Sequence, residues 1–167
     1  MTMANRIVIM SNGVIQQIAD PDTMFRHPAN LFVAGFIGSP GMNFVRAARL
    51  ADGRYSVLGQ PVPLPVAAAA EVIVGLRPEH MTLGGGAMNF AVRPSLIEGL
   101  GSEKYVYFDA PEDSRMDGAV ADDGRKAGRI IARLMNAGPI RIGETLALSA
   151  DPARLHVFDP VSGKALN

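Results

Sequence analysis

Cysteine and tryptophan are both absent from this sequence of 167 residues, and lysine occurs at only three positions. Without cysteine the chain has no disulfide framework, no thiolate nucleophile and no cysteine-based zinc site. The few lysines leave little capacity to clamp a polyphosphate with flexible ammonium groups. The lack of cysteine fits a chain that stays in the cytoplasm, and we expect that location.

An excess of charge of either sign is also missing, because sixteen basic residues balance sixteen acidic ones. No overall field therefore attracts nucleic acid or an anionic membrane from a distance. Seven phenylalanines and three tyrosines give limited surface for stacking bases, so we expect no nucleic-acid partner. Apolar runs are short, and Asn5 and Arg6 interrupt the first of them, so neither a membrane span nor a signal peptide is expected.

The N-terminus carries the signals of a β-hairpin. Residues 7–10 and 14–18 are apolar stretches that flank an Asn-Gly pair, and this pair supplies the positive backbone dihedrals of a tight turn. The first stretch is apolar on both faces, as in a strand that is covered on two sides. Nothing nearby in the sequence is large enough to cover it.

Two short helices are predicted after the hairpin. Asp20 before Pro21 is typical of an N-cap followed by a proline in the first turn, so the first helix should run to about Arg26. A second helix, with apolar residues at helical spacing, should begin at Pro28 and end at Gly38–Gly41.

Beyond this point the pattern changes to short strands separated by turn residues. Such a pattern is typical of a small barrel or sandwich, and we predict a mainly β fold. The change in composition at Gly38–Gly41 predicts a domain boundary that divides residues 1–38 from residues 39–167.

Two of the predicted strands can be described further. Residues 90–101, FAVRPSLIEGLG, are interpreted as one long strand bent at Pro94. In the next strand apolar and tyrosine side chains alternate. This alternation places Val106 and Phe108 on one face and Tyr105 and Tyr107 on the other.

A charged cluster follows the stretch EVIVGL at residues 71–76. Because Pro78 cannot donate to a strand ladder, the strand should end before it. An arginine two residues from a glutamate at a strand end, here Arg77 and Glu79, is typical of a solvated ion pair that closes a turn. The functional alternative for this cluster is an anion or metal contact, but His80 beside one glutamate provides too few ligands for a metal ion.

Catalytic and metal-binding patterns are otherwise missing. The three histidines, His27, His80 and His156, are more than fifty residues apart and follow no ligand spacing. Gly84–Gly86 lacks the lysine and the following helix of a phosphate-binding loop. We therefore expect no catalytic, cofactor-binding or metal-binding residues in this chain.

One family resemblance spans nearly the whole sequence. The stretch TMANRIVIMSNGVIQQIADPDTMFRHPANLFVAGFIGSPGMNF resembles the end of the nucleotide-binding domain in ATP-binding subunits of ABC importers of the maltose, glycerol-phosphate and multiple-sugar type. GLRPEH resembles a hallmark of the regulatory TOBE domain of these subunits, and LIEGLGSEKYVYFDA and RLHVFDPVSGKAL are similar to it as well. The Walker A, signature and Walker B motifs that precede this part in family members do not occur in the sequence.

The resemblance implies a fold and a function. Residues 39–167 should form an OB-like (TOBE) small barrel, and residues 1–38 should be the remaining hairpin and helices of an ABC ATPase domain. The chain should be a regulatory and dimerisation module and not itself an enzyme. It should hold no cofactor, since ATP and Mg²⁺ are bound by the parent subunit.

The resemblance also implies partners. These are a homodimer partner, the ATPase domain of the parent subunit, indirectly the membrane permease subunits, and a cytoplasmic regulator. The location implied is the cytoplasm, peripheral to the inner membrane.

Structural and interface residues are expected at three places. Arg77, Pro78 and Glu79 should fix the turn after residues 71–76, and Gly99 to Gly101 should permit a sharp bend between two barrel strands. The third place is the end of the second helix, which should be pinned to the barrel by Phe36, Met42 and Phe44.

The uncovered hairpin suggests self-association through residues 1–38, because Ile7, Ile9, Ile15 and Ile18 should be exposed. An alternative function stays open. Related small barrels bind oxyanions such as molybdate, and Ser95 and Lys104 could serve as donors here.

Overall fold

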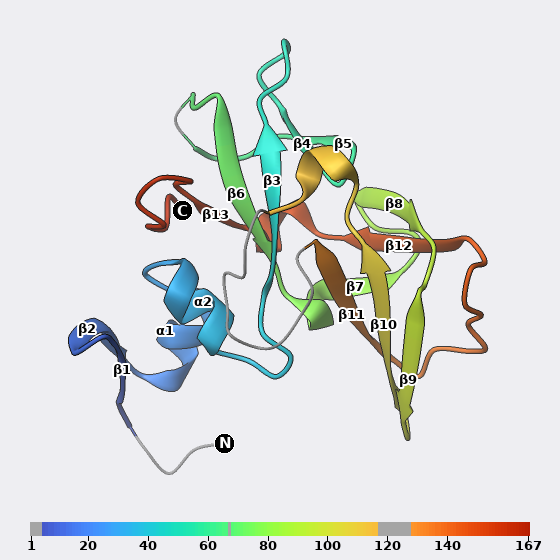
Figure 1. Cartoon of the computed structure of the whole chain (residues 1–167), viewed down its shortest axis with the longest axis horizontal. Coiled ribbons are helices and arrows are strands. Elements are labelled where there is room, and N and C mark those ends of the chain that lie inside the picture. Colours follow the sequence, from blue (N-terminus) through green and yellow to red (C-terminus); the bar gives the residue numbers. More distant parts are fainter. Residues whose placement is uncertain (1–4, 67, 117–127) are drawn as a thin grey trace.

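The N-terminal hairpin forms as predicted. The structure, a computed structural model, describes residues 5–66, 68–116 and 128–167. Strand β1 (Ile7–Ser11) pairs antiparallel with β2 (Val14–Ala19). Asn12 and Gly13 have positive φ, as a two-residue hairpin turn requires. Figure 1 shows this hairpin at one end of the molecule, beside the two helices.

Both helices begin at side-chain caps. Helix α1 (Pro21–Arg26) follows Asp20, whose carboxylate accepts a hydrogen bond from the backbone N–H of Thr23 at 2.9 Å, as the sequence predicted. Helix α2 (Leu31–Phe36) begins later than Pro28, because the side chain of Asn30 caps it by accepting from the N–H of Val33.

The rest of the described chain is mainly β, which confirms the predicted class. The strands are β3 (Asn43–Ala48), β4 (Tyr55–Val57), β5 (Gln60–Val62), β6 (Glu71–Leu76), β7 (Met81–Leu83), β8 (Met88–Val92), β9 (Leu96–Leu100), β10 (Glu103–Asp109), β11 (Arg129–Met135), β12 (Leu146–Ala150) and β13 (His156–Phe158). Short 3₁₀ helices lie at Pro78–His80, Glu112–Ser114 and Pro152–Arg154.

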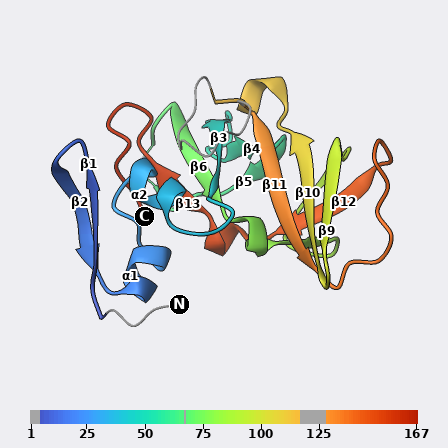
Figure 2. The same ribbon diagram turned by 60° about the horizontal axis from the view of Figure 1, so that its bottom comes forward.

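These strands are arranged in small antiparallel sheets. The orders are β13-β6-β3, β11-β10-β9 and β7-β12-β8, with β4 and β5 as a separate pair. Within the described residues the sheets do not close into one hydrogen-bonded barrel. Figure 2 shows the β1–β2 hairpin at one edge of the molecule and the sheet of β9, β10 and β11 toward the other.

The predicted alternation in β10 is confirmed. Val106 and Phe108 are buried in the main core, while Tyr105 and Tyr107 are half-buried on the other face. Burying each such apolar side chain stabilises the fold by about 1.5–3 kcal/mol. The main core takes side chains from each of these sheets.

The interpretation of residues 90–101 as one bent strand is wrong. The segment forms two strands in different sheets, since β8 pairs with β12 whereas β9 pairs with β10. The chain changes sheets at Pro94, which has no N–H to donate to a ladder. The next residue, Ser95, donates its N–H to the carbonyl of Tyr107, so pairing with β10 begins there.

Two of the glycines predicted at the β9–β10 bend differ in role. Gly101 lies in the turn with a φ of 65°, a conformation that favours glycine. Gly99 lies within β9 opposite Lys104, and a Cβ atom there would meet nothing within 4 Å. Only Gly101 is therefore required by the backbone of the turn.

A glycine that the sequence did not single out is required by packing. A Cβ atom on Gly75 in β6 would lie 3.0 Å from the ring of Phe158 and closer still to the sulfur of Met42. We expect Gly75→Ala to lower the free energy of unfolding by about 1–3 kcal/mol through overpacking. Urea denaturation followed by circular dichroism measures this loss. The control is Gly99→Ala, which changes another strand glycine and should alter stability little. Equal effects of the two substitutions would contradict the packing argument.

A buried asparagine joins two sheets. Asn43, at the start of β3, is only 2% exposed. Its Nδ2 donates to the carbonyls of Leu76 and Ile131 at 3.0 and 2.9 Å, and its Oδ1 accepts from the N–H of Ile131 at 2.9 Å. The side chain thus ties β3 and β6 to β11 of the neighbouring sheet.

The N-terminal helices dock onto the β region, residues 39–167. Ala34 of α2 packs with Met42, Ile73 and Phe158 in a small buried cluster. The last residues of the chain also take part: Leu31 donates its N–H to the carbonyl of Gly163, and Ala165 donates to the carbonyl of Ala29. The predicted boundary after residue 38 stays a prediction. Among the described residues no helix is both long enough and apolar enough to span a membrane.

A candidate site where the helices meet the β region

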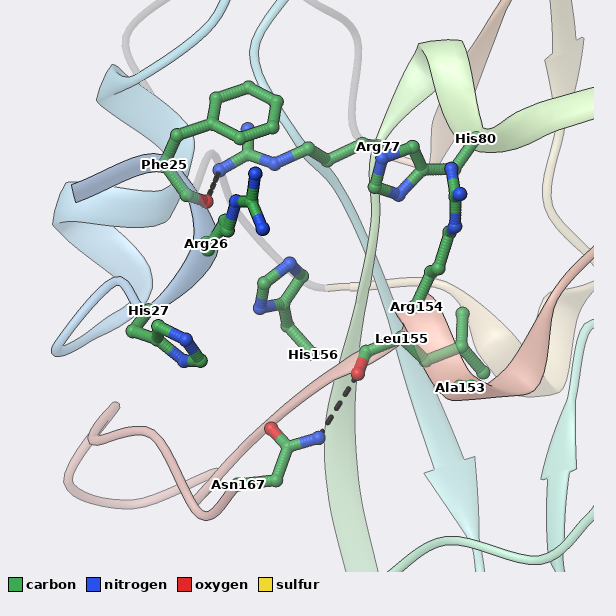
Figure 3. Close-up of a pocket in the computed structure, with 10 residues that line it drawn as sticks. All are labelled: Phe25, Arg26, His27, Arg77, His80, Ala153, Arg154, Leu155, His156 and Asn167. Carbon is green, nitrogen blue, oxygen red and sulfur yellow. Dashed lines mark hydrogen bonds between the residues drawn. The ribbon is translucent and has the colours of Figure 1, made fainter. Parts of the chain in front are cut away.

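Arg77 connects the β region to both N-terminal helices. It follows β6, and its side chain is among the largest that are fully buried, with 1% of the residue exposed. One terminal nitrogen donates to the carbonyl of Ile37 at 2.9 Å and the other to the carbonyl of Phe25 at 2.5 Å. The guanidinium carbon also lies 3.6 Å from the centre of the Phe25 ring (Figure 3).

The sequence predicted a solvated ion pair between Arg77 and Glu79, and this prediction is wrong, because the side chain of Arg77 is buried and donates to backbone carbonyls. Phe25 lies in the last turn of α1 and Ile37 is the C-cap of α2, so both carbonyls belong to helix ends whose acceptors lack intrahelical partners. A buried cation placed there is stabilised by the partial negative charge of the helix ends. Burial lowers the pKa of Arg77 to about 10, with Glu79 opposing the shift, so the guanidinium stays charged at neutral pH. The buried Pro78 begins the 3₁₀ helix that turns the chain away.

A cavity of about 590 Å³ lies beside Arg77 (Figure 3). Its walls come from α1 and the residue after it, from the segment after β6, from the 3₁₀ helix before β13 and the start of β13, and from the C-terminal tail. The lining residues are Phe25, Arg26, His27, Arg77, His80, Ala153, Arg154, Leu155, His156 and Asn167.

All three histidines line the cavity, although they are more than fifty residues apart in the sequence. Three arginines accompany them, and none of the described lining residues has an acidic side chain. Two carboxylates outside the lining act on these groups: Asp22 pairs with Arg26 at 2.9 Å, and Glu79 acts on Arg77 and His80. The side chains that line the cavity therefore carry an excess of positive charge.

Two of the histidines are held in the neutral form. Burial, together with the neighbouring Arg77, His80 and His27, lowers the pKa of His156 to about 4. Burial also lowers the pKa of His80, against the opposing effect of Glu79. At neutral pH the positive charge of the cavity comes mainly from its arginines.

Some polar atoms of the cavity lining are hydrogen-bonded within the protein, and others have no partner. Asn167 donates to the carbonyl of Leu155 at 3.0 Å and accepts from the N–H of Val157 at 2.8 Å. Two buried nitrogens in the lining, Nε of Arg77 and Nδ1 of His80, have no hydrogen-bond partner. Most buried polar atoms in proteins are paired, so these two stand out.

Within residues 5–66, 68–116 and 128–167, no group of three or more His, Asp or Glu side chains is placed to hold a metal ion.

Two of the three residues expected at the end of α2 lie where the sequence indicated. Met42 is fully buried against Ala34, and Phe44 is half-buried with its ring edge-to-face on Phe158 at 5.9 Å. Phe36 differs: it is 67% exposed and stacks on Phe32, with ring centres 6.1 Å apart. The expected packing of Phe36 against the barrel is therefore wrong, because α2 turns a different face, that of Ala34, toward the β region.

The hairpin exposes only part of the set that was expected: Ile15 and Ile18 are exposed, but Ile7 and Ile9 are not. Ile9 is buried with Met24 and Val33, and Ile7 is half-buried against this cluster. The side chains of the hairpin that are exposed are Val8, Met10, Val14, Ile15 and Ile18. The helices cover one face of β1, and the opposite face stays open.

The two donors considered for an oxyanion are already engaged. Ser95 donates its hydroxyl to the carbonyl of Tyr107 at 3.2 Å, and Lys104 donates its ammonium group to the carbonyl of Gly138. These contacts do not favour the oxyanion alternative.

Comparison with known proteins supports the resemblance seen in the sequence. Residues 38–81 match the family model described as the MalK OB fold domain, which agrees with an OB-like arrangement of the sheets. The trehalose import ATP-binding protein SugC of Mycobacterium tuberculosis is 38% identical over 189 residues, covering 99% of this chain and 48% of that protein. The sn-glycerol-3-phosphate import ATP-binding protein UgpC of Paracoccus denitrificans is 37% identical over 168 residues, covering 99% of this chain and 44% of that protein.

The UgpC protein of Bordetella avium is 35% identical, with 98% of this chain and 44% of that protein covered. The chain thus spans about half the length of the curated relatives that it matches. Its likeness to the C-terminal part of import ATP-binding proteins is confirmed.

Proposed function

Because the chain contains a match to the MalK-type OB fold and is similar throughout to the C-terminal part of sugar-type ABC importer ATP-binding subunits, we propose that it is their regulatory and dimerisation module. The observation that carries this proposal is the alignment over 99% of the chain with proteins named for trehalose and sn-glycerol-3-phosphate import. The solute of the parent importer would be a sugar or a related compound.

The open face of the hairpin supports an attachment to a larger ATPase domain. Apolar side chains on two adjacent strands, among them Val14 and Ile18, are exposed where a soluble domain normally buries them. In the proposed assembly the ATPase domain of the parent subunit covers this face. That domain would bind ATP and Mg²⁺, and this chain would bind neither.

The contacts of the helices support a mechanical role. A module that holds two subunits together between turnovers needs a stiff link to the ATPase domain. The carbonyls at the ends of α1 and α2 are fixed to Arg77, and Ala34 is packed on Met42, so the link is stiff. The proposed partners are a second copy of the subunit, the permease subunits through the ATPase domain, and a cytoplasmic regulator, at the inner face of the membrane.

A chimera tests this function. The part of the Paracoccus protein that aligns with residues 1–167 is replaced by this chain, and dimerisation and ATP hydrolysis are measured. We expect the chimera to dimerise and hydrolyse ATP, and a version that stops at the position of residue 38 to dimerise less. A folded chimera that neither dimerises nor hydrolyses ATP would count against the proposal.

The open hairpin also predicts how the isolated chain behaves. We expect it to self-associate through residues 1–38, because two copies can bury their open hairpin faces together. The double substitution Ile15→Lys with Ile18→Lys should convert it to a monomer in light scattering. The control is Ile142→Lys with Val161→Lys, which changes two exposed residues outside the hairpin. A monodisperse monomer with an ordered hairpin in the unmodified chain would show that the hairpin needs no cover.

A further inference from the structure

The positively charged cavity beside Arg77 has the size of a small-molecule site. Its volume of about 590 Å³ lies in the range of pockets that hold metabolites, roughly 300–1,000 Å³. Arg26 and Arg154 line it with exposed side chains, whereas Arg77 is buried. Figure 3 shows the side chains of Arg26, Arg77 and His156 converging from three different segments.

This set of side chains suits an anion better than any other ligand. Arginine presents a planar fork of N–H donors that matches the oxygens of a phosphate group. No described lining residue has an acidic side chain, and two buried nitrogens, Nε of Arg77 and Nδ1 of His80, have no hydrogen-bond partner. Phe25, Ala153 and Leu155 add apolar surface that could contact the carbon part of an organic ligand.

We propose that this cavity binds a small phosphate-bearing metabolite, with Arg26 and Arg154 contacting the phosphate and His80 and His156 lying beside it. The binding does not depend on the proposed role in transport. Because the walls come from both α1 and the β region, a bound ligand would strengthen the docking of the helices. The ligand would therefore raise the melting temperature, by about 5 °C at a concentration a hundred times its dissociation constant.

Binding should depend on pH through the histidines. His156 faces Arg77, His80 and His27, and His80 faces Glu79, Arg77 and Arg154, so most of the neighbouring charges oppose protonation in the empty cavity. A bound anion reverses this balance and favours the protonated rings. Affinity for an anion of constant charge should therefore rise as the pH falls from 7.5 to 5.5. Sulfate is the suitable probe, because its own charge does not change over this range.

The experiment is calorimetric titration of the whole chain with glucose 6-phosphate, inorganic phosphate, sulfate and uncharged glucose. We expect saturable binding of the phosphates and none of glucose. Tighter binding of glucose 6-phosphate than of inorganic phosphate would identify an organic phosphate as the ligand, and the reverse would identify the free ion. Both results support a phosphate site.

Matched arginine variants locate the binding. Arg154→Gln and Arg26→Gln should each weaken glucose 6-phosphate binding about tenfold, since each removes one charged hydrogen bond. Arg141→Gln is the control, because Arg141, like Arg26, forms an exposed ion pair with a carboxylate on its own segment. It should change affinity less than twofold. All variants alter exposed arginines, so circular dichroism should show them folded.

Three results would overturn the proposal. These are no saturable heat from any phosphate at millimolar concentration with folded protein, equal weakening by Arg141→Gln and Arg154→Gln, and binding of glucose as tight as that of glucose 6-phosphate. Histidine proton resonances add an independent readout: the apparent pKa of His156 should rise when sulfate is bound. A pKa that does not move would contradict contact between the anion and this ring.

Discussion

Replacing Arg77 by alanine is expected to lower the free energy of unfolding by about 4 kcal/mol. The substitution removes two charge-assisted hydrogen bonds, each worth about 1.5–3 kcal/mol, and the stacking on Phe25. It also leaves the carbonyls of Phe25 and Ile37 without their partner and creates a cavity in a buried position. Urea denaturation and thermal melting followed by circular dichroism measure the loss, and the melting temperature should fall by about 10 °C.

Two further substitutions sharpen this test. Arg77→Lys keeps the charge, but lysine has no planar fork with which to reach two carbonyls. The free energy of unfolding of this variant should therefore lie between those of the alanine variant and the native protein. Arg154→Gln changes an exposed arginine in the same cavity and should alter stability by less than about 0.5 kcal/mol. If Arg77→Ala left stability unchanged but abolished dimer or regulator binding, the residue would serve an interface and not the fold.

The second large effect is expected at Asn43. Asn43→Ala should lower the free energy of unfolding by about 3 kcal/mol, because it leaves the carbonyls of Leu76 and Ile131 and the N–H of Ile131 without side-chain partners. These groups are buried between two sheets and water cannot replace the lost bonds. Urea denaturation measures the stability, and hydrogen exchange measures the protection of the Ile131 amide, which should decrease sharply.

A matched asparagine provides the control for this loss. Asn89 in β8 is exposed and donates one hydrogen bond to the carbonyl of Gly86. Asn89→Ala should therefore cost much less than Asn43→Ala and leave the exchange of the Ile131 amide unchanged. Similar losses at the two positions would mean that the bonds of Asn43 do not hold the sheets together.

Local signals in the sequence were enough to place several elements. The Asn-Gly pair located the hairpin turn, Asp20 before Pro21 located α1, and the alternation around Val106 separated the buried from the exposed face of β10. Each of these signals depends on residues that are close together in the chain. The split of residues 90–101 at Pro94 was missed, because a proline in a strand pattern does not show whether the chain bends or changes sheets.

The candidate site could not be predicted in the same way. Arg77 binds carbonyls 40 and 52 positions away, and a backbone carbonyl carries no signal of its identity in the sequence. The cavity gathers His27, His80 and His156 from segments that meet only after folding. Helical spacing identified the apolar residues of α2 but not which of its faces would be covered, and for this reason Phe36 was misplaced.

The pairing of residues 29–31 with residues 163–165 sets the order of events during synthesis. Leu31 and Ala29 leave the ribosome before their hydrogen-bond partners Gly163 and Ala165, which are added more than 130 residues later. Helix α2 can therefore complete its docking only after nearly the whole β region has been translated. Until then an apolar face of the nascent helices stays exposed. A chaperone or a neighbouring nascent chain could bind this face.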